Sequence, residues 1–550
     1  MRTTTMKLLL VAILLGIPST ALSQVPPPDK VLFNGKIFTS NATQPYVEAL
    51  AIRGDRVIAV GASREIIALA GKETKRIDVG GRTVIPGIND AHVHLSVGPN
   101  TYDLPIKSRN PSWQEIKEAV SAGVAKAPKG TWIQGVFGNT VLDDPQATRI
   151  ALDQLAPDHP VMLTIWGANA VLLNSAAFRR LGVRDDQPNP EGGTYARNPA
   201  DGKLTGMAFQ FARFQVGRHY SELATDKEAG QELNDFFGDA MRMGITSIQD
   251  MAYPIAAPRC VVLLKKTPPP IRVRVIWFGL TDEHGRLQEK GHGLPRHPAS
   301  LTTLGGIKWI LDGTPIDHSG AMREPYSDRP STRGELNFSQ HEMEEMLRES
   351  LRNDDQLMVH VAGDRTAETF LNAMDATGGE KVWSQRRVRF EHGDGLLPDL
   401  VPRAKRLGII VVQNPTHFTL PELFNERFGE KRAQQLQPLK SLLDAGIPVA
   451  IGSDGPSNPY LNMMLASTFG RNPTQAMTRE QAVTAYTLTS AYAELEEKEK
   501  GSLEPGKLAD LAVLSQDIFT VPVGDLPKTK SVMTMVGGKI VYDAKVVVVR

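Results

Sequence analysis

The chain has 550 residues, more than one simple hydrophobic core accommodates, which indicates two or three domains. Hydrophobic residues make up 41% of the chain and charged residues 22%, proportions typical of a globular enzyme. The net charge of +1 gives no general attraction to nucleic acid or to an anionic membrane, and the single cysteine, Cys260, excludes an internal disulfide and a thiolate metal cage.

The first 23 residues have the pattern of a secretory signal peptide. Arg2 and Lys7 give a basic start, residues 8–17 are apolar, and the small-x-small sequence of residues 21–23 is typical of a cleavage site. The apolar run is too short to span a bilayer comfortably, although an uncleaved anchor is the alternative. We expect the mature protein to be periplasmic or secreted and to carry no membrane anchor.

Strand-like runs separated by turn residues occur at both ends of the chain. They are residues 31–39, with an Asn34-Gly35 turn, and residues 49–60, 509–514 and 532–542. Two independent terminal hairpins would be only marginally stable. We therefore predict one small β-sandwich domain built from residues 24–83 and 501–550.

Two histidines end the apolar run of residues 84–95. His92 and His94 are spaced i, i+2, and on a β-strand such residues point to the same face. Two neutral imidazoles side by side at the C-terminal end of a strand form half of a site for a divalent metal. The alternative is that both histidines lie in a surface loop. The Pro86-Gly87 pair favours the strand over this alternative, because it indicates a tight turn directly before the strand.

The long middle segment, residues 84–500, alternates strand-like runs with helical patterns. Eight β-α units in series favour a (β/α)8 TIM barrel, an α/β fold. Residues of about 96–243 are too many for one unit, so we predict an insertion over the barrel mouth. The expected strands are the run that ends at His92 and residues 244–250, 271–278, 306–312, 357–361, 388–392, 409–413 and 448–454.

Side chains that bind metals fall at the ends of these expected strands. Taken singly, each has an ordinary alternative, such as a buried structural histidine or a helix-capping aspartate. Together they indicate an active site, because barrel enzymes place their sites at the C-terminal face. His92 and His94 end strand 1, Lys308 lies in strand 4, His360 ends strand 5, His392 ends strand 6 and Asp454 ends strand 8.

The same segments resemble those of a known family. The chain resembles the amidohydrolase superfamily and, within it, the YtcJ-like amidohydrolase family 3, and it is similar to N-substituted formamide deformylases. The resemblance covers nearly all of the expected mature chain. The matching motifs are Pro86-Gly-Ile-Asn-Asp-Ala-His-Val-His94, His360-Val-Ala-Gly-Asp364, Glu391-His392, Gln413-Asn-Pro-Thr-His417, Gly452-Ser-Asp-Gly-Pro456 and residues 501–511.

The resemblance implies a metal site that holds one or two divalent ions, zinc in the first instance. His92 and His94 would bind the more buried ion together with Asp454, and His360 and His392 would bind a second ion. Lys308 matches a strand-4 lysine that some members carboxylate to bridge two ions. The alternative for Lys308 is an ion pair with a barrel carboxylate such as Asp312, which would leave a site for one metal.

The implied reaction is hydrolysis of a carbon–nitrogen bond by metal-activated water. Asp454 would take the proton from the attacking water and pass it to the leaving nitrogen. His417 would bind a substrate oxygen or the oxyanion.

Substrate contacts are expected from Trp166 and from the loop that contains Arg323. Asn169 and Gln210 stand where family members often carry a histidine and a glutamate, so these two positions bear on the substrate.

Two other functions stay open at this stage. One is deamination or opening of a cyclic amide on the same site, and the other is a binding protein that kept the barrel but lost turnover. We expect a small-molecule amide as the partner and no nucleic acid. The sequence leaves a homodimer open.

Overall fold

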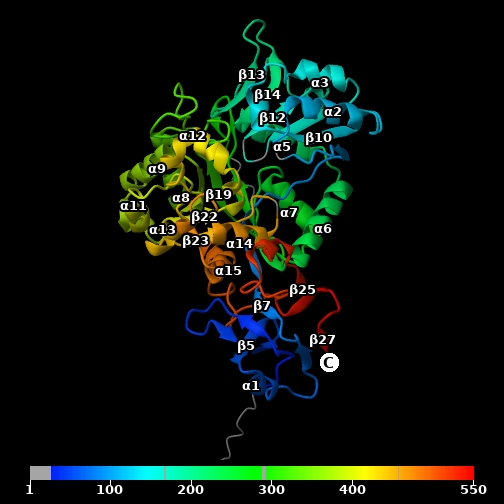
Figure 1. Cartoon of the computed structure of the whole chain (residues 1–550), viewed down its shortest axis with the longest axis vertical. Coiled ribbons are helices and arrows are strands. Elements are labelled where there is room, and N and C mark those ends of the chain that lie inside the picture. The colour runs from blue at the N-terminus through cyan, green and yellow to red at the C-terminus, as the bar shows by residue number, and fades with distance from the viewer. Residues whose placement is uncertain (1–25, 109, 166, 168, 288–292, 456) are drawn as a thin grey trace, which may run out of the picture.

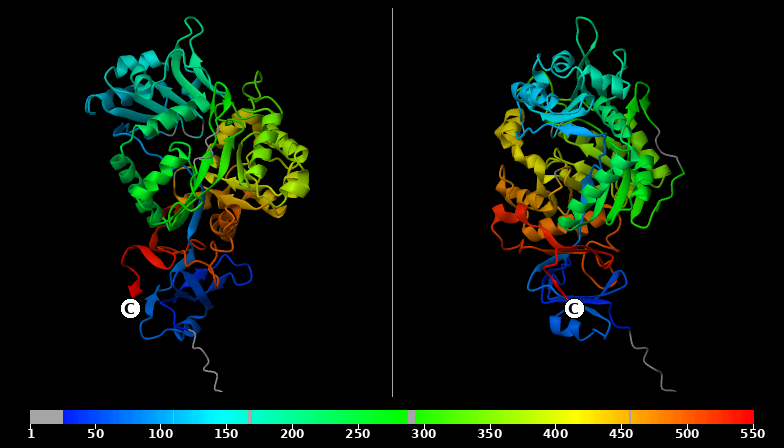
Figure 2. Two further views of the ribbon diagram at one scale, coloured as in Figure 1. Left: turned by 180° about the vertical axis from the view of Figure 1, so that it is seen from behind. Right: turned by 90° about the vertical axis from the view of Figure 1, so that its right-hand side faces the viewer.

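A barrel forms the centre of the molecule (Figure 1). The computed structural model describes residues 26–108, 110–165, 167, 169–287, 293–455 and 457–550, so the predicted signal peptide lies outside the described residues. Sheets built from the two termini lie at one end of the barrel, and a separate sheet, which we call the outer sheet, lies at the other end in every view (Figure 2). No helix within the described ranges combines the length and apolar character needed to cross a membrane.

The predicted eight-stranded barrel is confirmed. Its strands follow chain order around the sheet, and every neighbouring pair is parallel. The backbone N–H of Asp454 donates to the carbonyl of His92 at 2.9 Å, which links the end of the last strand to the first and nearly closes the sheet. The strands are β8 (Ile88–Val93), β15 (Ile245–Met251), β16 (Arg272–Phe278), β19 (Thr302–Ile310), β20 (Leu357–Val361), β21 (Arg389–His392), β22 (Ile410–Gln413) and β23 (Val449–Ile451).

Helices cover the outside of the barrel, and α8 (Gln340–Arg352) illustrates why they form. Ser339 and Glu342 make a reciprocal capping box at its start, and Met343, Met346 and Leu347 lie on one buried face at helical spacing. The other helices that follow the outer sheet are α6 (Asp226–Arg242), α7 (Ala257–Lys266), α9 (Asp364–Ala376), α10 (Gly379–Trp383), α11 (Val401–Arg406), α12 (Pro421–Ala433), α13 (Leu439–Asp444), α14 (Pro459–Thr468), α15 (Arg479–Tyr486) and α16 (Leu488–Ala493). Short elements in the same part are β17 (Thr281–Asp282), β18 (Gly285–Arg286) and the 3-10 helices η2 (Pro415–Thr419), η3 (Pro473–Gln475) and η4 (Val523–Lys528).

The apolar run that precedes the two histidines forms two strands instead of the single strand that was predicted. β7 (Thr83–Pro86) belongs to a terminal sheet, and the chain passes directly from it into barrel strand β8. Gly87 makes this passage possible, because a Cβ atom there would lie 2.0 Å from Oγ1 of Thr246. The boundary between the two domains therefore falls at Gly87, a few residues after the predicted position.

The two chain ends together form two sheets that share one hydrophobic cluster. β7 lies between a strand from the N-terminal part and a strand from the C-terminal part. The Asn34-Gly35 turn joins no hairpin, because the strands before and after it enter different sheets. The remaining elements are β1 (Lys30–Phe33), β2 (Lys36–Phe38), β3 (Tyr46–Val47), β4 (Ala49–Arg53), β5 (Arg56–Gly61), α1 (Ser63–Ile67), β6 (Lys75–Asp78), β24 (Leu511–Leu514), β25 (Ser531–Val536), β26 (Lys539–Asp543) and β27 (Val548–Val549).

The outer sheet forms from the stretch between β8 and β15. Its strands bury both faces, since side chains alternate: Trp132 and Met162 pack on one face, while Ile133 and Leu163 pack on the other. The strands are β9 (Thr101–Asp103), β10 (Trp132–Phe137), β11 (Val161–Ile165), β12 (Ala170–Leu173), β13 (Gly193–Arg197) and β14 (Leu204–Gln210). The helices of this stretch before α6 are α2 (Trp113–Val124), η1 (Asn139–Asp143), α3 (Arg149–Leu155), α4 (Ser175–Leu181) and α5 (Phe211–Glu222).

Candidate metal centre

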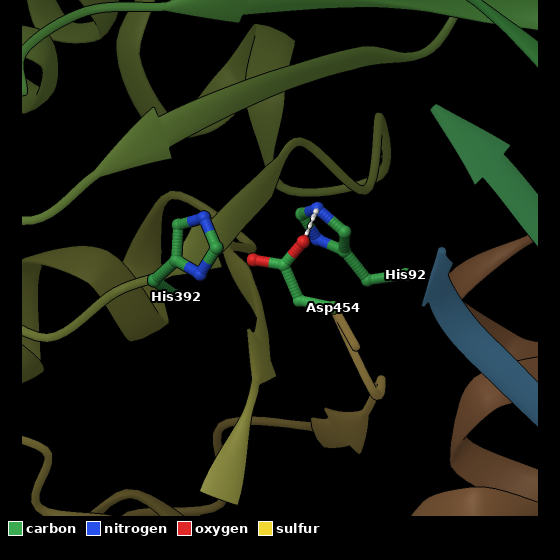
Figure 3. A group of neighbouring side chains, drawn as sticks. All are labelled: His92, His392 and Asp454. Carbon is green, nitrogen blue, oxygen red and sulfur yellow. Dashed lines mark ion pairs between the residues drawn. The ribbon is translucent and has the colours of Figure 1, made fainter. Parts of the chain in front are cut away.

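The C-terminal ends of the barrel strands bring the predicted ligands together. His92, His392 and Asp454 each offer a ligand atom, and these atoms lie within 4.8 Å of one another (Figure 3). His392 and Asp454 have φ angles of 66° and 45°, in the left-handed region that residues with side chains rarely occupy. Such strain concentrates at functional sites, and here it turns the chain immediately after strands β21 and β23.

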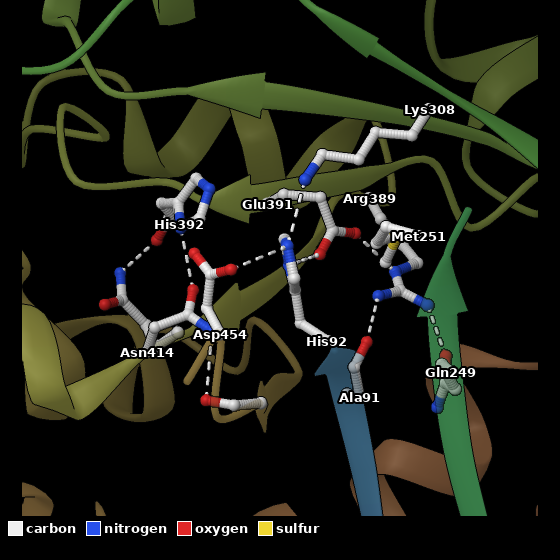
Figure 4. A network of polar contacts seen from close by, with 12 residues as sticks. Ala91, His92, Gln249, Met251, Lys308, Arg389, Glu391, His392, Asn414 and Asp454 are labelled. Carbon is white, nitrogen blue, oxygen red and sulfur yellow. Dashed lines mark hydrogen bonds and ion pairs between the residues drawn. The ribbon is translucent and has the colours of Figure 1, made fainter. Parts of the chain in front are cut away.

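Three of the histidines hold one ring nitrogen in a hydrogen bond and keep the other for a ligand. Nδ1–H of His92 donates to Glu391 at 2.7 Å, and Nδ1–H of His392 donates to Oδ1 of Asn414 at 2.7 Å (Figure 4). Nδ1–H of His94 donates to the carbonyl of Met251 at 2.8 Å. Because the acceptors of His92 and His392 are oxygens, Nε2 is the unprotonated nitrogen in these two rings, as a metal ligand requires.

The two carboxylate oxygens of Asp454 lie next to different histidines. Oδ1 lies 3.3 Å from Nε2 of His94 and 3.8 Å from Nε2 of His92, whereas Oδ2 lies 3.5 Å from Nε2 of His417. Burial raises the pKa of the Asp454 carboxyl, but its electrostatic interaction with the His92 ring and its contacts with His417 and His94 outweigh it and hold the pKa well below its usual range. Asp454 is therefore ionised at neutral pH.

The protonation states of the neighbouring rings suit different tasks. Burial and the positive charge of Lys308 lower the pKa of His92 to about 4, and the same two causes lower that of His360 to about 3, so both rings are neutral. Burial lowers the pKa of His417, but the hydrogen bond and charge of Asp454 more than compensate and raise it above its ordinary value. His417 is thus the ring best suited to hold a proton.

Lys308 reaches the centre of this group from β19. Its Nζ lies 2.9 Å from Nε2 of His92, the nitrogen that a metal would take, and the side chain is buried. Burial lowers the pKa of Lys308 to about 8. A free ammonium cannot ligate a cation, so metal binding at His92 requires this amine to move away or to carry a carboxylate.

His360 lies beside His392, with the ring centroids 4.5 Å apart, but its Nε2 atom already has a backbone partner. Its Nε2–H donates to the carbonyl of Gly313 at 3.1 Å. The tightest group of ligand atoms joins His392 to His92 and Asp454, whereas the resemblance assigned His392 to a second ion with His360. The donor set of imidazole nitrogens and one carboxylate fits a divalent metal such as zinc.

A fully buried charged pair supports the His92 ring. Oε1 of Glu391 accepts from Nε–H of Arg389 at 2.7 Å, while Oε2 accepts from His92. Burial raises the pKa of Glu391, but the charge of Arg389 and the hydrogen bond from His92 outweigh it and lower the pKa to about 2. Arg389 also donates to the carbonyl of Ala91 at 2.8 Å, which ties the pair to strand β8 (Figure 4).

A cavity of about 380 Å³, which we call the inner cavity, opens onto the metal centre. Asn169, for which a substrate contact was predicted, is one of its lining residues, and the contact itself stays a prediction. Gln210 lies behind Asn169, accepting from its amide at 3.1 Å and donating to Ser319 at 2.8 Å. The inner cavity is lined by His94, Lys308, His360, His392, His417 and Asp454, by outer-sheet residues that include Thr164, and by Arg213, Phe214, Tyr253 and Phe278.

Arg323 requires a correction. Ion pairs with Glu368 at 3.1 Å and Asp399 at 2.8 Å hold its side chain, and it lines a separate cavity away from the histidines. The prediction that Arg323 contacts substrate is therefore not supported by its position. Trp166, the remaining predicted contact, lies outside the described residues.

Sequence reasoning did not assign a role to the residues that orient the ligands. Glu391 and Asn414 lie inside motifs that were noted, yet only the structure pairs them with His92 and His392. Arg213 and Tyr253 were not noted at all, and they line the wall of the cavity. Their signal in the sequence is weak, because Arg213 lies within helix α5, and Tyr253 follows the end of β15 but is not one of the residue types that suggested a metal site.

Comparisons with known proteins agree with this geometry. A family model described as "Amidohydrolase family" matches residues 75–542. The N-substituted formamide deformylase of Arthrobacter pascens is 27% identical over 94% of this chain and 98% of its own length. The putative amidohydrolase YtcJ of Bacillus subtilis is 26% identical over 92% of this chain and 98% of its own length. An uncharacterised metal-dependent hydrolase from Pyrococcus horikoshii has the same fold, with a TM-score of 0.69 and 22% identity over 90% of this chain and 99% of that chain.

Proposed function

Since the chain belongs to the amidohydrolase family, we propose that it is an exported, metal-dependent hydrolase that cleaves the carbon–nitrogen bond of a small, non-peptide amide. The relative named N-substituted formamide deformylase supports an amide as the substrate. The division of the two Asp454 oxygens between His94 and His417 is the observation on which the proposal depends.

The two oxygens of Asp454 suit two tasks. Oδ1 faces the imidazole nitrogens and would hold a divalent metal together with His92, His94 and His392, and Lys308 would contribute if carboxylated. Oδ2 faces His417 and the cavity, where substrate and water enter. When bound, the metal would lower the pKa of a water molecule to about 7 and polarise the scissile carbonyl.

The proton transfers of amide hydrolysis then fall to side chains of this chain. The water oxygen forms a bond to the carbonyl carbon, and Oδ2 of Asp454 takes a proton from that water. His417, whose pKa is raised by the hydrogen bond and charge of Asp454, donates a hydrogen bond to the oxygen that gains negative charge. The carbon–nitrogen bond breaks as Asp454 returns the proton to nitrogen, and the products are a carboxylic acid and an amine.

A panel of N-substituted formamides and other small amides tests this function on metal-loaded protein that starts at Gln24. We expect Asp454→Asn to lower turnover on the order of a hundredfold or more, since positioned acid–base catalysis contributes 10²–10⁴-fold. Asp394→Asn is the matched control, because Asp394 is a carboxylate of the same cavity that accepts a hydrogen bond from Gln437 and interacts with His417 through its charge alone. Turnover by Asp454→Asn within threefold of the parent, with metal retained, would contradict the assignment.

The same panel separates the alternative reactions. Scoring carboxylate formation apart from ammonia release distinguishes amide hydrolysis from deamination. Metal analysis after metal-replete expression should find one or two divalent ions per chain, with zinc the first ion to test, and strong chelation should abolish turnover. Protein without a stoichiometric ion would contradict the proposed metal centre and favour a binding protein.

We also propose that residues 1–23 direct export and are removed. The basic start, the apolar run and the small residues at 21 and 23 support this. Expression of the full chain in a bacterium, followed by fractionation and N-terminal sequencing, should find protein in the periplasm or the medium that begins at Gln24. Protein that keeps Met1 and stays in the cytoplasm would contradict export.

A further inference from the structure

The inner cavity adjoins a second and larger space. This second cavity, of about 970 Å³, lies between α5, the start of α6 and the outer sheet, and we call it the outer cavity. The two cavities share lining residues, and together they would give a substrate a path to the metal centre. Five residues line both: Ser96, Thr164, Arg213, Tyr253 and Pro254.

Arg213 is the only charged residue among those five. Its guanidinium carbon lies 4.9 Å from the centre of the Tyr253 ring and 5.3 Å from that of Phe214, so two aromatic faces hold it. The Tyr253 ring in turn contacts the metal-ligating ring of His94, with centroids 5.2 Å apart. One aromatic side chain thus separates the guanidinium from the metal centre.

Arg213 lines both cavities, and within the described part of the chain one of its donors makes a side-chain hydrogen bond. A guanidinium carries five N–H donors, and one of them, on Nη1, bonds to the Tyr253 hydroxyl. Within the described ranges no carboxylate forms an ion pair with Arg213, whereas Arg323 and Arg389 each have one or two such partners. A fixed, unneutralised guanidinium on a substrate path is an arrangement that recognises a planar anion through two parallel hydrogen bonds.

We propose that the substrate is an amide that also carries a carboxylate, and that Arg213 binds this carboxylate while the amide lies at the metal centre. This inference rests on the proposed amide hydrolysis and names its substrate class, with Arg213 as the residue that determines specificity. The outer cavity beyond Arg213 is lined by three carboxylates, Asp103, Glu228 and Glu232, and by one ammonium, Lys227, so its net negative charge favours an anion at the junction instead.

Matched pairs of N-acyl amino acids and their carboxamides test the inference. In each pair only the carboxylate changes, and the number of methylenes between nitrogen and carboxylate is varied from one to three. We expect metal-loaded wild-type protein to show a kcat/KM about 10- to 100-fold higher for the acid of the best pair, as charge-assisted hydrogen bonds typically contribute. Arg213→Met should reduce this ratio to near one, and Arg213→Lys should keep part of it because a point charge remains without the fork.

A surface variant provides the control for loss of a positive charge. Arg242 lies on α6 in an exposed ion pair with Asp239 and lines neither cavity, so Arg242→Met should keep the wild-type ratio. Tyr253→Phe should lower the ratio less than Arg213→Met does, since it removes one anchor of the guanidinium. A wild-type ratio at or below one, or an unchanged ratio in Arg213→Met, would overturn the inference.

Binding of inert analogues separates this inference from the proposed reaction. Ketone analogues, in which a methylene replaces the amide nitrogen, are titrated calorimetrically into metal-loaded protein as acid and carboxamide pairs. Tighter binding of the acid that disappears in Arg213→Met supports the carboxylate site even if no amide is hydrolysed. Amide hydrolysis with equal binding of acid and carboxamide would leave the proposed reaction standing and refute the carboxylate site.

Discussion

Replacement of Glu391 by glutamine tests the buried support of His92, a proposed metal ligand. The carboxylate accepts from His92 at 2.7 Å and from Arg389 at 2.7 Å, and all three side chains are buried. A glutamine amide has one oxygen, so it can accept from only one of these two donors. Its NH₂ group then faces the other donor, which loses its acceptor.

The expected effects follow from the two contacts. Loss of the partner that orients a metal-ligating histidine typically costs 10- to 100-fold in metal affinity, and we expect a loss in this range for Glu391→Gln. Breaking a buried ion pair by removal of one charge destabilises a protein by about 3–5 kcal/mol. Since glutamine retains one acceptor, we expect the free energy of unfolding to fall by about 3 kcal/mol.

Competition with a chromophoric chelator measures the metal affinity, and urea unfolding measures the stability. Glu494→Gln is the matched control, because Glu494 forms another buried ion pair, with Lys500 at 2.7 Å, away from the metal centre. We expect this control to lose stability while its metal affinity stays within threefold of the parent. If Glu391→Gln keeps its metal affinity within threefold, or if both variants lose it equally, the orienting role of Glu391 is refuted.

Three further substitutions address other parts of the structure. Lys308→Ala should lower the metal content by one ion per chain if the lysine is carboxylated, and a short carboxylic acid should restore part of the activity; two ions with near-normal turnover would rule the bridge out. Gly87→Ala should destabilise the fold by about 1–3 kcal/mol or more in urea unfolding, because its methyl group collides with Thr246, and an unchanged midpoint would contradict that contact. Burial and the adjacent Glu342 raise the folded-state pKa of Glu191, so ionised Glu191 costs stability as the pH rises above its ordinary value of 4.5. Glu191→Gln should therefore match the parent in thermal stability at pH 4 and exceed it at pH 8. If the variant is less stable than the parent at pH 8, ionised Glu191 stabilises the fold and the reasoning is refuted.

The barrel could be predicted because each of its strands is recognisable from a short local stretch of sequence. Each expected strand is a short apolar run, and four of the runs end in a polar side chain that the structure places at one mouth, as with His360 and His392. The break between β7 and β8 was not predictable in this way, because both strands are buried throughout and only Gly87 separates them in the sequence. Only the proximity of Thr246, from a distant strand, shows why the glycine is needed.

For a related reason, the contacts that orient the side chains of the site could not be predicted from local sequence patterns. Glu391 is 299 residues from the His92 ring that it orients, and no spacing rule connects them. Arg323 and Arg213 illustrate the same limit, since both are arginines in loop-like or helix-start sequences. Carboxylates brought in from other segments neutralise Arg323, whereas Arg213 faces the cavities. Which arginine is available to a ligand depends on the tertiary structure.

The strand pairing around β7 has a consequence for biosynthesis. One edge of β7 pairs with β2, which is made early, but the other edge pairs with β24 near the end of the chain. A nascent chain therefore leaves β7, the strand that leads into β8 and its histidines, paired on one edge only until residues 511–514 have been made. Pairing over so long a sequence separation is slow, so the junction between the terminal sheet and the barrel is completed late in folding.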